Sequence, residues 1–176
     1  MTNTTLINIS KTHIPQQYKN AKYWCENNNH VYIGRANSEV IDGNNWPEIS
    51  SDWCNPYKIN KYNTREQVIE KYKHYIINKL IENNYNLCLL FKKLRGKVLG
   101  CWCVPLQCHG EVLIQIINAF PENYEPCPDF SQECNICNVR CDEMSGWKCD
   151  LCHNCWCDEH NENTCECVKN ILVNIF

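Results

Sequence analysis

The chain has 176 residues, enough for one sizeable core or for a medium-sized and a small domain. Its charge is uneven: residues 1–125 carry 14 Lys and Arg against 11 Asp and Glu, whereas residues 126–176 carry 3 against 9. The balances of +3 and −6 favour two units and give no support to a non-specific nucleic-acid binder, which would be strongly basic. No apolar run reaches the roughly 20 residues that a membrane span needs.

Cysteine is the most informative residue type, because 16 of the residues are cysteine. Usage this high requires either an oxidising compartment or bound metal. The first ten residues lack a basic segment followed by a long apolar core, so we expect no signal peptide. The sequence therefore predicts an intracellular protein whose cysteines stay reduced and bind zinc.

The first third of the chain predicts two strands separated by loops. A short strand, suited to a sheet edge, covers residues 6–10, and a second, rich in β-forming residues, covers 31–35. Residues 11–30 are predicted to form a loop, and residues 36 to about 63 a longer, irregular one. A loop of that second length usually carries function or packs against a site.

Two helical segments are predicted next. Thr64–Gln67 fits a capping box, and the apolar residues after it keep a helical period, which predicts a helix over residues 65–82. Residues 87–94 continue a helical face, and Gly96 can cap its C-terminal end.

A strand, a tight loop and a helix are predicted between residues 98 and 120. Residues 98–103 alternate in a β-compatible pattern, Pro105 prevents helix continuation, and Cys108 and His109 stand where a long apolar helix should begin. Free N–H groups and the positive dipole end of a helix favour anions and lower the pKa of a thiol. This helix start is therefore a candidate catalytic or binding site.

The alternation of strands and helices predicts an α/β fold with a small parallel or mixed sheet and flanking helices. If the strands at 31–35 and 98–103 are parallel neighbours, their carboxyl ends share one edge, where open α/β sheets usually bind ligands. The candidate crevice at this edge is lined by Arg35, Asn55, Cys103, Cys108 and His109.

Several of these residues also have a purely structural interpretation. Arg35 could clamp a phosphate or carboxylate in a bidentate manner, or it could end a strand in solvent. Asn55 precedes a proline and is most often a turn former. Cys101 and Cys103, two residues apart, share one face of a strand and could be buried hydrophobic residues or metal ligands.

The adjacent Cys108 and His109 leave two chemistries open. Cys108 could be a nucleophile of low pKa, with His109 as its acid, base or orienting group. Adjacent side chains seldom point the same way, so Cys108 could need a partner such as His30 or His74 instead of His109. Alternatively, a third metal could be held at Cys101, Cys103, Cys108 and His109, or by some of these four together with Cys54 or Cys25.

Four groups of residues occur in a specific order along the front of the chain. They are Tyr32-Ile33-Gly34-Arg35, then Asn55-Pro56-Tyr57, then Thr64-Arg65-Glu66 with Tyr72, and finally Gly96-Lys97-Val98-Leu99-Gly100-Cys101-Trp102-Cys103 followed by Cys108-His109-Gly110 and Val112-Leu113. Over about residues 5–120 they resemble a family of domains of unknown function, numbered 4326. The resemblance implies a phage, bacterial or large-DNA-virus source and no established activity. The abundance of Asn, Ile, Lys and Tyr suggests A- and T-rich codons, as in large DNA viruses.

A Pro-rich connector, residues 123–133, separates the front domain, residues 1–122, from a cysteine-rich tail at 134–170. The tail holds four close ligand pairs, Cys134/Cys137, Cys149/Cys152, Cys157/His160 and Cys165/Cys167, which suit two tetrahedral zinc sites. About 35 residues bury too little apolar surface to fold alone, so zinc is expected to supply the stability.

The tail spacing, with Gly146-Trp147-Lys148-Cys149 and Trp156 before Cys157, resembles an AN1-like zinc finger with a treble-clef-like fold. The resemblance implies that Cys134, Cys137, Cys157 and His160 bind one zinc ion and that Cys149, Cys152, Cys165 and Cys167 bind the other. Cys165 stands where the family usually has histidine, and cysteine is an equally good zinc ligand. Cys155 or Cys141 could replace an assigned ligand.

Three functions follow from these expectations. The first is a zinc-binding viral accessory protein whose front domain binds an anionic small molecule such as a nucleotide, with catalysis left open. The second is a non-enzymatic adaptor whose finger docks a host protein of the ubiquitin and protein-degradation machinery, as the resemblance implies. The third is a virion or assembly component. Each places the protein in the host cytoplasm or the virion, without membrane contact.

Overall fold

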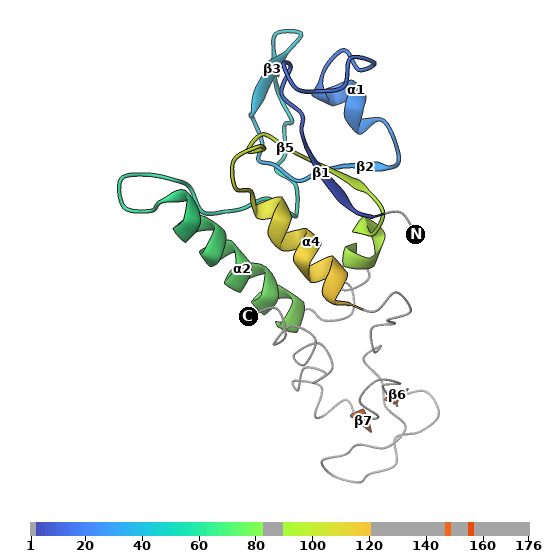
Figure 1. Cartoon of the computed structure of the whole chain (residues 1–176), viewed down its shortest axis with the longest axis vertical. Helices are drawn as coiled ribbons and strands as arrows, with labels where there is room; N and C mark the ends of the chain where they lie inside the picture. The colour runs from blue at the N-terminus through green and yellow to red at the C-terminus, as the bar shows by residue number, and fades with distance from the viewer. Residues whose placement is uncertain (1–2, 83–89, 121–146, 149–154, 157–176) are drawn as a thin grey trace. The chain divides into compact units, whose positions relative to one another are not determined.

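The computed structural model describes residues 3–82, 90–120, 147–148 and 155–156 (Figure 1). The chain divides into two compact units, Met1–His74 with Lys93–Ile117 and Tyr75–Lys92 with Asn118–Phe176. The first unit contains the sheet and the candidate site. No helix within the described ranges is long and apolar enough to cross a membrane.

A three-stranded parallel sheet forms the centre of the first unit. β5 (Val98–Cys101) lies between β1 (Thr5–Asn8) and β2 (His30–Tyr32), in the order β1-β5-β2. Both outer strands begin their pairing opposite Val98. The predicted α/β architecture with a small parallel sheet is confirmed, as is the parallel pairing of the second strand with the last. β1 lies at the sheet edge.

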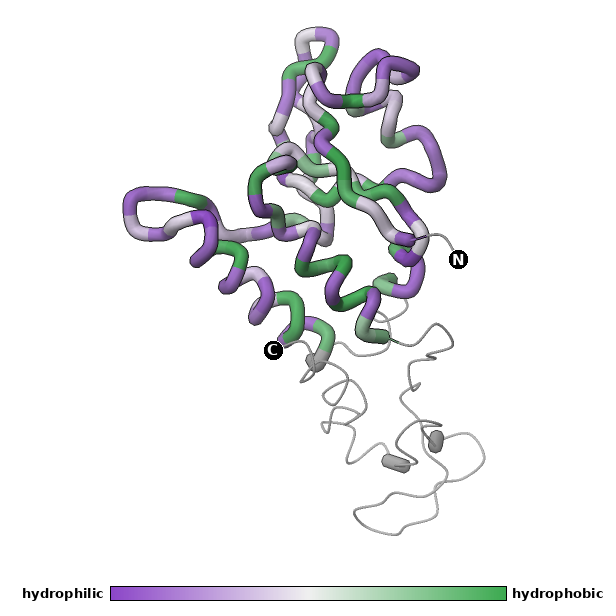
Figure 2. Tube along the Cα trace, viewed as in Figure 1, coloured by the Kyte–Doolittle hydropathy of each residue, from purple (hydrophilic) through white to green (hydrophobic). Residues whose placement is uncertain are grey.

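The centre of the sheet is apolar, and Figure 2 shows hydrophobic residues along its strands and along α4 (His109–Ala119). Leu99 of β5 and Ile33, which follows β2, are fully buried. Gly100 is required beside them, because a Cβ atom at this position would lie 2.6 Å from the ring of the buried Trp24. Position 100 of β5 is therefore packed too tightly to accept a side chain without a shift of Trp24.

Helices α1 (Ala21–Cys25) and α2 (Arg65–Glu82) lie before β5 in the described part of the chain, and α1 was not expected. α1 lies within the segment predicted to be a loop, so that prediction was wrong over these residues. α2 has the predicted bounds. Its capping box is formed, since the Thr64 N–H donates to Gln67 Oε1 over 2.8 Å and the Gln67 N–H donates to Thr64 Oγ1 over 3.3 Å. Residues 90–94 are also helical.

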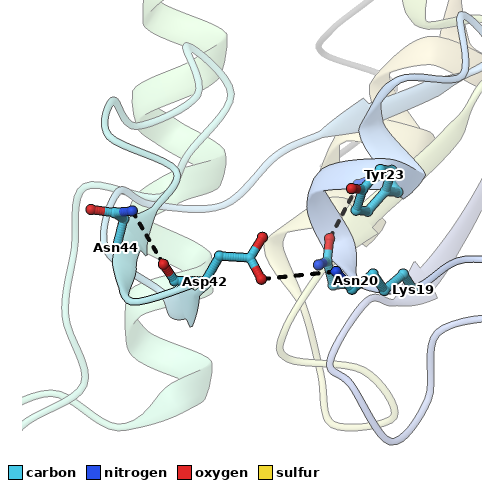
Figure 3. A network of polar contacts seen from close by, with 5 residues as sticks. All are labelled: Lys19, Asn20, Tyr23, Asp42 and Asn44. Atoms are coloured by element: carbon cyan, nitrogen blue, oxygen red, sulfur yellow. Dashed lines mark hydrogen bonds and ion pairs between the residues drawn. The ribbon is translucent and has the colours of Figure 1, made fainter.

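A β-hairpin occupies part of the segment predicted to be irregular, which corrects that prediction too. β3 (Glu39–Ile41) pairs antiparallel with β4 (Asn44–Trp46), and the two residues between them, Asp42 and Gly43, have φ angles of 50° and 83°. Positive φ at both positions is typical of the type I′ turn that Asp-Gly favours. Figure 3 shows Asp42 next to Lys19, with 3.9 Å between the charged atoms. Both side chains are exposed, so this pair contributes at most about 1 kcal/mol.

The described part of the second unit includes two very short strands from the tail. β6 (Trp147–Lys148) pairs antiparallel with β7 (Cys155–Trp156). The eight expected zinc ligands of the tail lie outside the described residues, as does the connector at 123–133. The AN1-like finger and its treble-clef-like fold therefore stay predictions.

Because Trp24 packs closely against Gly100 of β5, adding a methyl group at position 100 should lower the stability of the fold. We expect Gly100→Ala to lower the free energy of unfolding by about 1–3 kcal/mol, because the new Cβ overlaps the Trp24 ring. Lys22→Ala, at an exposed position of the neighbouring α1, should change it by less than about 0.5 kcal/mol. Urea unfolding followed by circular dichroism measures both values, and equal stability of the two variants would contradict the packing described.

Candidate metal centre and adjoining pocket

The turn between β5 and α4 is held at both ends by hydrogen bonds. Asn8, at the end of β1, donates from its Nδ2 to the Val104 carbonyl. At the start of α4, the Cys108 N–H donates to the Glu111 carboxylate over 3.3 Å, and the Glu111 N–H donates to the Cys108 carbonyl over 3.0 Å. Cys108 is thus the residue that caps α4, and the turn has a defined place beside the sheet.

Four side chains that commonly bind metals converge at this turn. The ligand atoms of Cys101, Cys103, Cys108 and His109 all lie within 4.8 Å of one another. His109 Nδ1 is 3.8 Å from Cys108 Sγ and 4.0 Å from Cys101 Sγ. A tetrahedral zinc ion, with bonds of roughly 2.0–2.3 Å, places its ligand atoms about 3.5–3.8 Å apart. The cluster is therefore close to the size that a zinc ion requires.

The His109 ring is oriented by a contact on its far side. The side chain is only 6% exposed, and its Nε2 lies 2.9 Å from the Ile33 carbonyl oxygen. A carbonyl can only accept, so Nε2 carries a proton and donates it, which directs Nδ1 toward the thiols. The Tyr72 ring packs edge-on against the imidazole, with 5.0 Å between the ring centres. Metal-binding histidines typically have such a second hydrogen bond.

The cysteines of the first unit differ in their exposure. Cys108 is fully buried and Cys101 is 2% exposed, whereas Cys103 is half-buried. All three are free thiols, as are Cys25 and Cys54, which do not belong to the cluster. The cysteine predicted to be a nucleophile, Cys108, is thus the most enclosed of the three, and Cys103 is the most accessible.

The four side chains also change one another's protonation. Burial lowers the pKa of the His109 imidazole, but hydrogen bonds with Cys101 and Cys103 outweigh this effect and raise that pKa to about 9. Hydrogen bonds from Cys101, Cys108 and His109 lower the pKa of the Cys103 thiol. Hydrogen bonds with Cys101 and Cys103, together with burial, raise the pKa of the Cys108 thiol. The mutual hydrogen bonds of the cluster therefore shift the pKa values of the Cys103 and Cys108 thiols in opposite directions.

A pocket of about 550 Å³ lies beside the cluster. Every member of the cluster except Cys108 lines it, and so do the cationic side chains Arg35, Lys58 and Arg65. No Asp or Glu is among the described residues of its wall. The positive charge of this wall favours an anionic ligand.

Two of the predicted ligand-binding residues brace the pocket wall. Arg35 Nε donates to the Asn55 carbonyl over 2.7 Å, and Arg35 Nη2 donates to the Tyr57 carbonyl. The Asn55 side chain donates to the Val68 carbonyl over 3.0 Å and accepts from the Tyr57 N–H over 2.8 Å. Arg65, which was not among the predicted ligand-binding residues, is half-buried and donates from Nη1 to the Gln107 carbonyl over 3.2 Å.

The histidines expected as alternative partners of Cys108 lie elsewhere. His30 Nδ1 is 2.8 Å from the Trp24 carbonyl oxygen, and His74 Nε2 is 3.3 Å from a Glu70 carboxylate oxygen. Neither belongs to the cluster. Of the two alternatives, the structure brings the adjacent His109, and not His30 or His74, to the Cys108 sulfur.

Comparison with known proteins identifies the family of this domain. The model of a family described as "Domain of unknown function (DUF4326)" matches residues 16–119, which include the whole cluster. The chain belongs to the DUF4326 family. This confirms the resemblance of the front domain, and the match ends before the cysteine-rich tail. No solved structure matches the chain.

Two viral proteins are similar to this DUF4326 domain. Uncharacterized protein R718 of Acanthamoeba polyphaga mimivirus is 36% identical over 94 residues, which are 49% of this chain and 65% of the relative. An uncharacterized 12.4 kDa protein from the nrdA-td intergenic region of Enterobacteria phage T4 is 33% identical over 75 residues, or 43% and 63% of the two chains. The chain thus spans just under two thirds of the length of each relative.

The two hydrogen bonds that the Arg35 guanidinium donates to backbone carbonyls predict that this side chain stabilises the fold through its forked geometry as well as its charge. Arg35→Lys keeps the charge but cannot place donors on both the Asn55 and Tyr57 carbonyls, so we expect a loss of about 1–3 kcal/mol in unfolding free energy. Lys61→Arg, at an exposed site outside the pocket wall, is the matched control and should be neutral. Urea unfolding measures both, and an unchanged stability of Arg35→Lys would show that the brace is unimportant.

Proposed function

We propose that the front domain is a zinc-binding domain whose pocket binds an anionic small molecule, with a nucleotide as the leading candidate. The proposal is carried by one observation: four ligand atoms of three thiols and one imidazole lie within 4.8 Å of one another. Three sulfur ligands and one nitrogen ligand in a compact group are typical of zinc. The nearby positive charge of the pocket supports the second half of the proposal.

Zinc would add a direct connection between β5 and α4. Cys101 belongs to β5, His109 belongs to α4, and Cys103 and Cys108 lie between them. Four protein ligands complete a tetrahedron, so the metal has a structural role. Because three of the ligands also line the pocket, zinc would fix the position of that wall. The sheet edge, the helix start and the pocket would then form one rigid unit.

The choice of a nucleotide combines charge with aromatic surface. Tyr57 and Trp102 line the same pocket as Lys58 and Arg65. The Trp102 indole is held by its Nε1, which donates to the Tyr32 hydroxyl over 3.0 Å. An aromatic ring fixed in this way can stack on a base, while the cations bind phosphate oxygens. These paired features favour a nucleotide over a simple inorganic anion.

The tail adds two further zinc ions to this proposal. It rests on the four Cys/His pairs of the sequence and on the ladder between β6 and β7. β6 ends one residue before Cys149, and β7 ends one residue before Cys157. A short antiparallel ladder placed between ligand pairs is compatible with the two-zinc finger assigned to residues 134–170.

Native mass spectrometry of the full chain purified with zinc tests the metal centre. We expect three zinc ions per chain and one fewer in Cys108→Ala, because three remaining ligands hold zinc far more weakly than four. Cys54→Ala, outside the cluster, should keep the wild-type number. The cluster is tested by the difference in zinc count between Cys108→Ala and Cys54→Ala, and not by the total zinc count. The result therefore does not depend on how many zinc ions the tail binds.

A cobalt titration of the unmodified chain supports this measurement without relying on a variant that folds. Cobalt bound by thiolates gives charge-transfer absorption in the near ultraviolet, and the intensity should correspond to three thiolates at the cluster plus those of the tail. The metal centre at the cluster would be ruled out if Cys108→Ala bound as many zinc ions as the wild type and if the cobalt–thiolate absorption did not exceed that expected for the tail alone.

Calorimetric titration with adenosine and guanosine mono-, di- and triphosphates tests the pocket. We expect binding that weakens about tenfold in Lys58→Ala and in Arg65→Gln, because each variant removes a charge-assisted contact. Lys61→Ala, whose side chain lies outside the pocket wall, should bind like the wild type. Failure of every nucleotide to bind the zinc-loaded chain would reject the nucleotide proposal while leaving the metal centre standing.

A further inference from the structure

Cys103 differs from the other members of the cluster in its surroundings. Cys101 and His109 are 2% and 6% exposed, and Cys108 is fully buried and absent from the pocket wall. Cys103 is half-buried, lines the pocket and lies after the end of β5, within the turn. A molecule in the pocket can therefore reach this sulfur more easily than the other two.

We propose that Cys103 is a reactive thiolate that attacks an electrophilic carbon of an anionic molecule bound in the pocket. This step rests on the zinc centre and the anion pocket of the proposed function. It moves the nucleophile from Cys108, where the sequence placed it, to the cysteine that the pocket exposes. All four residues of the cluster hold the metal before the reaction, and Cys103 is the one of its three thiolates that the pocket exposes.

The chemistry needs no additional reactant besides the electrophile. A metal-bound cysteine is already deprotonated and keeps a lone pair on sulfur, so no general base is required. This lone pair forms the carbon–sulfur bond, and the carbon's bond to its leaving group breaks, with the electron pair departing on that group. No atom needs an external oxidant or reductant, and no proton is transferred. The product is a thioether at Cys103 and a free leaving-group anion.

The charge of the pocket selects the electrophile. Arg65 and Lys58 line the pocket together with Cys103, and no described carboxylate does. These cations raise the local concentration of an anionic molecule and leave a neutral analogue unaffected. Cys54 provides an internal comparison, because it is also a half-buried free thiol but does not line the pocket. Cys25 is a second comparison, since burial raises the pKa of its thiol to about 12.

Iodoacetate and iodoacetamide form a matched pair of probes for this inference. Both transfer a two-carbon group to sulfur and release iodide, but only iodoacetate is negatively charged. The zinc-loaded full chain is treated with each, and peptide mass spectrometry gives the rate at every cysteine. We expect Cys103 to react first among the cysteines of the front domain. Its ratio of iodoacetate to iodoacetamide rates should exceed that of Cys54 by roughly tenfold.

Variants and the zinc count make each outcome decisive. Lys58→Ala and Arg65→Gln should lower the rate ratio at Cys103 toward that of Cys54, whereas Lys61→Ala should leave it unchanged. If zinc occupies the cluster and Cys103 reacts no faster than Cys54, or shows the same rate ratio, this inference is overturned and the metal centre stands. If native mass spectrometry finds no zinc at the cluster, the proposed function fails and the inference fails with it.

Discussion

The hydrogen bond between the buried His109 imidazole and the Ile33 carbonyl connects the two elements on which the site depends. The Ile33 N–H donates to the Gly100 carbonyl over 3.1 Å, so the residue that receives the imidazole is itself fixed to the central strand. The bond therefore ties the start of α4 to the sheet and turns Nδ1 toward the sulfurs. Without it, the thiols would face an imidazole free to rotate, and the spacing suited to zinc would be lost.

The position of Cys108 at the helix cap explains how two adjacent side chains come together. A capping residue has extended backbone angles, whereas the next residue is already helical. Neither strand alternation nor helical spacing applies across this junction, so Cys108 and His109 can approach the same point. Gly110 completes the arrangement, because a Cβ atom there would lie 2.6 Å from Leu6 and keep α4 away from β1.

Local signals explain which parts of this fold could be predicted. The helix at 65–82 has its own capping box and apolar period, and the parallel pairing follows from alternating strands and helices. The hairpin also had a local signal, the Asp42-Gly43 turn, but each of its strands has only 3 residues, too few to show the alternation expected of strands. The role of Arg35 could not be predicted, because its partners lie 20 and 22 residues further along the chain.

Under the proposed function, the shared wall would link metal occupancy to ligand binding. Three of the four cluster residues line the pocket, so any ion that orders them also orders the surface that a ligand meets. If the ordered wall binds the ligand more tightly, linkage requires the ligand to tighten metal binding by the same factor. A ligand that binds only the ordered wall also stabilises the fold around β5 and α4. The proposed coupling would depend on the shared placement of Cys101, Cys103 and His109 and not on the identity of the anion.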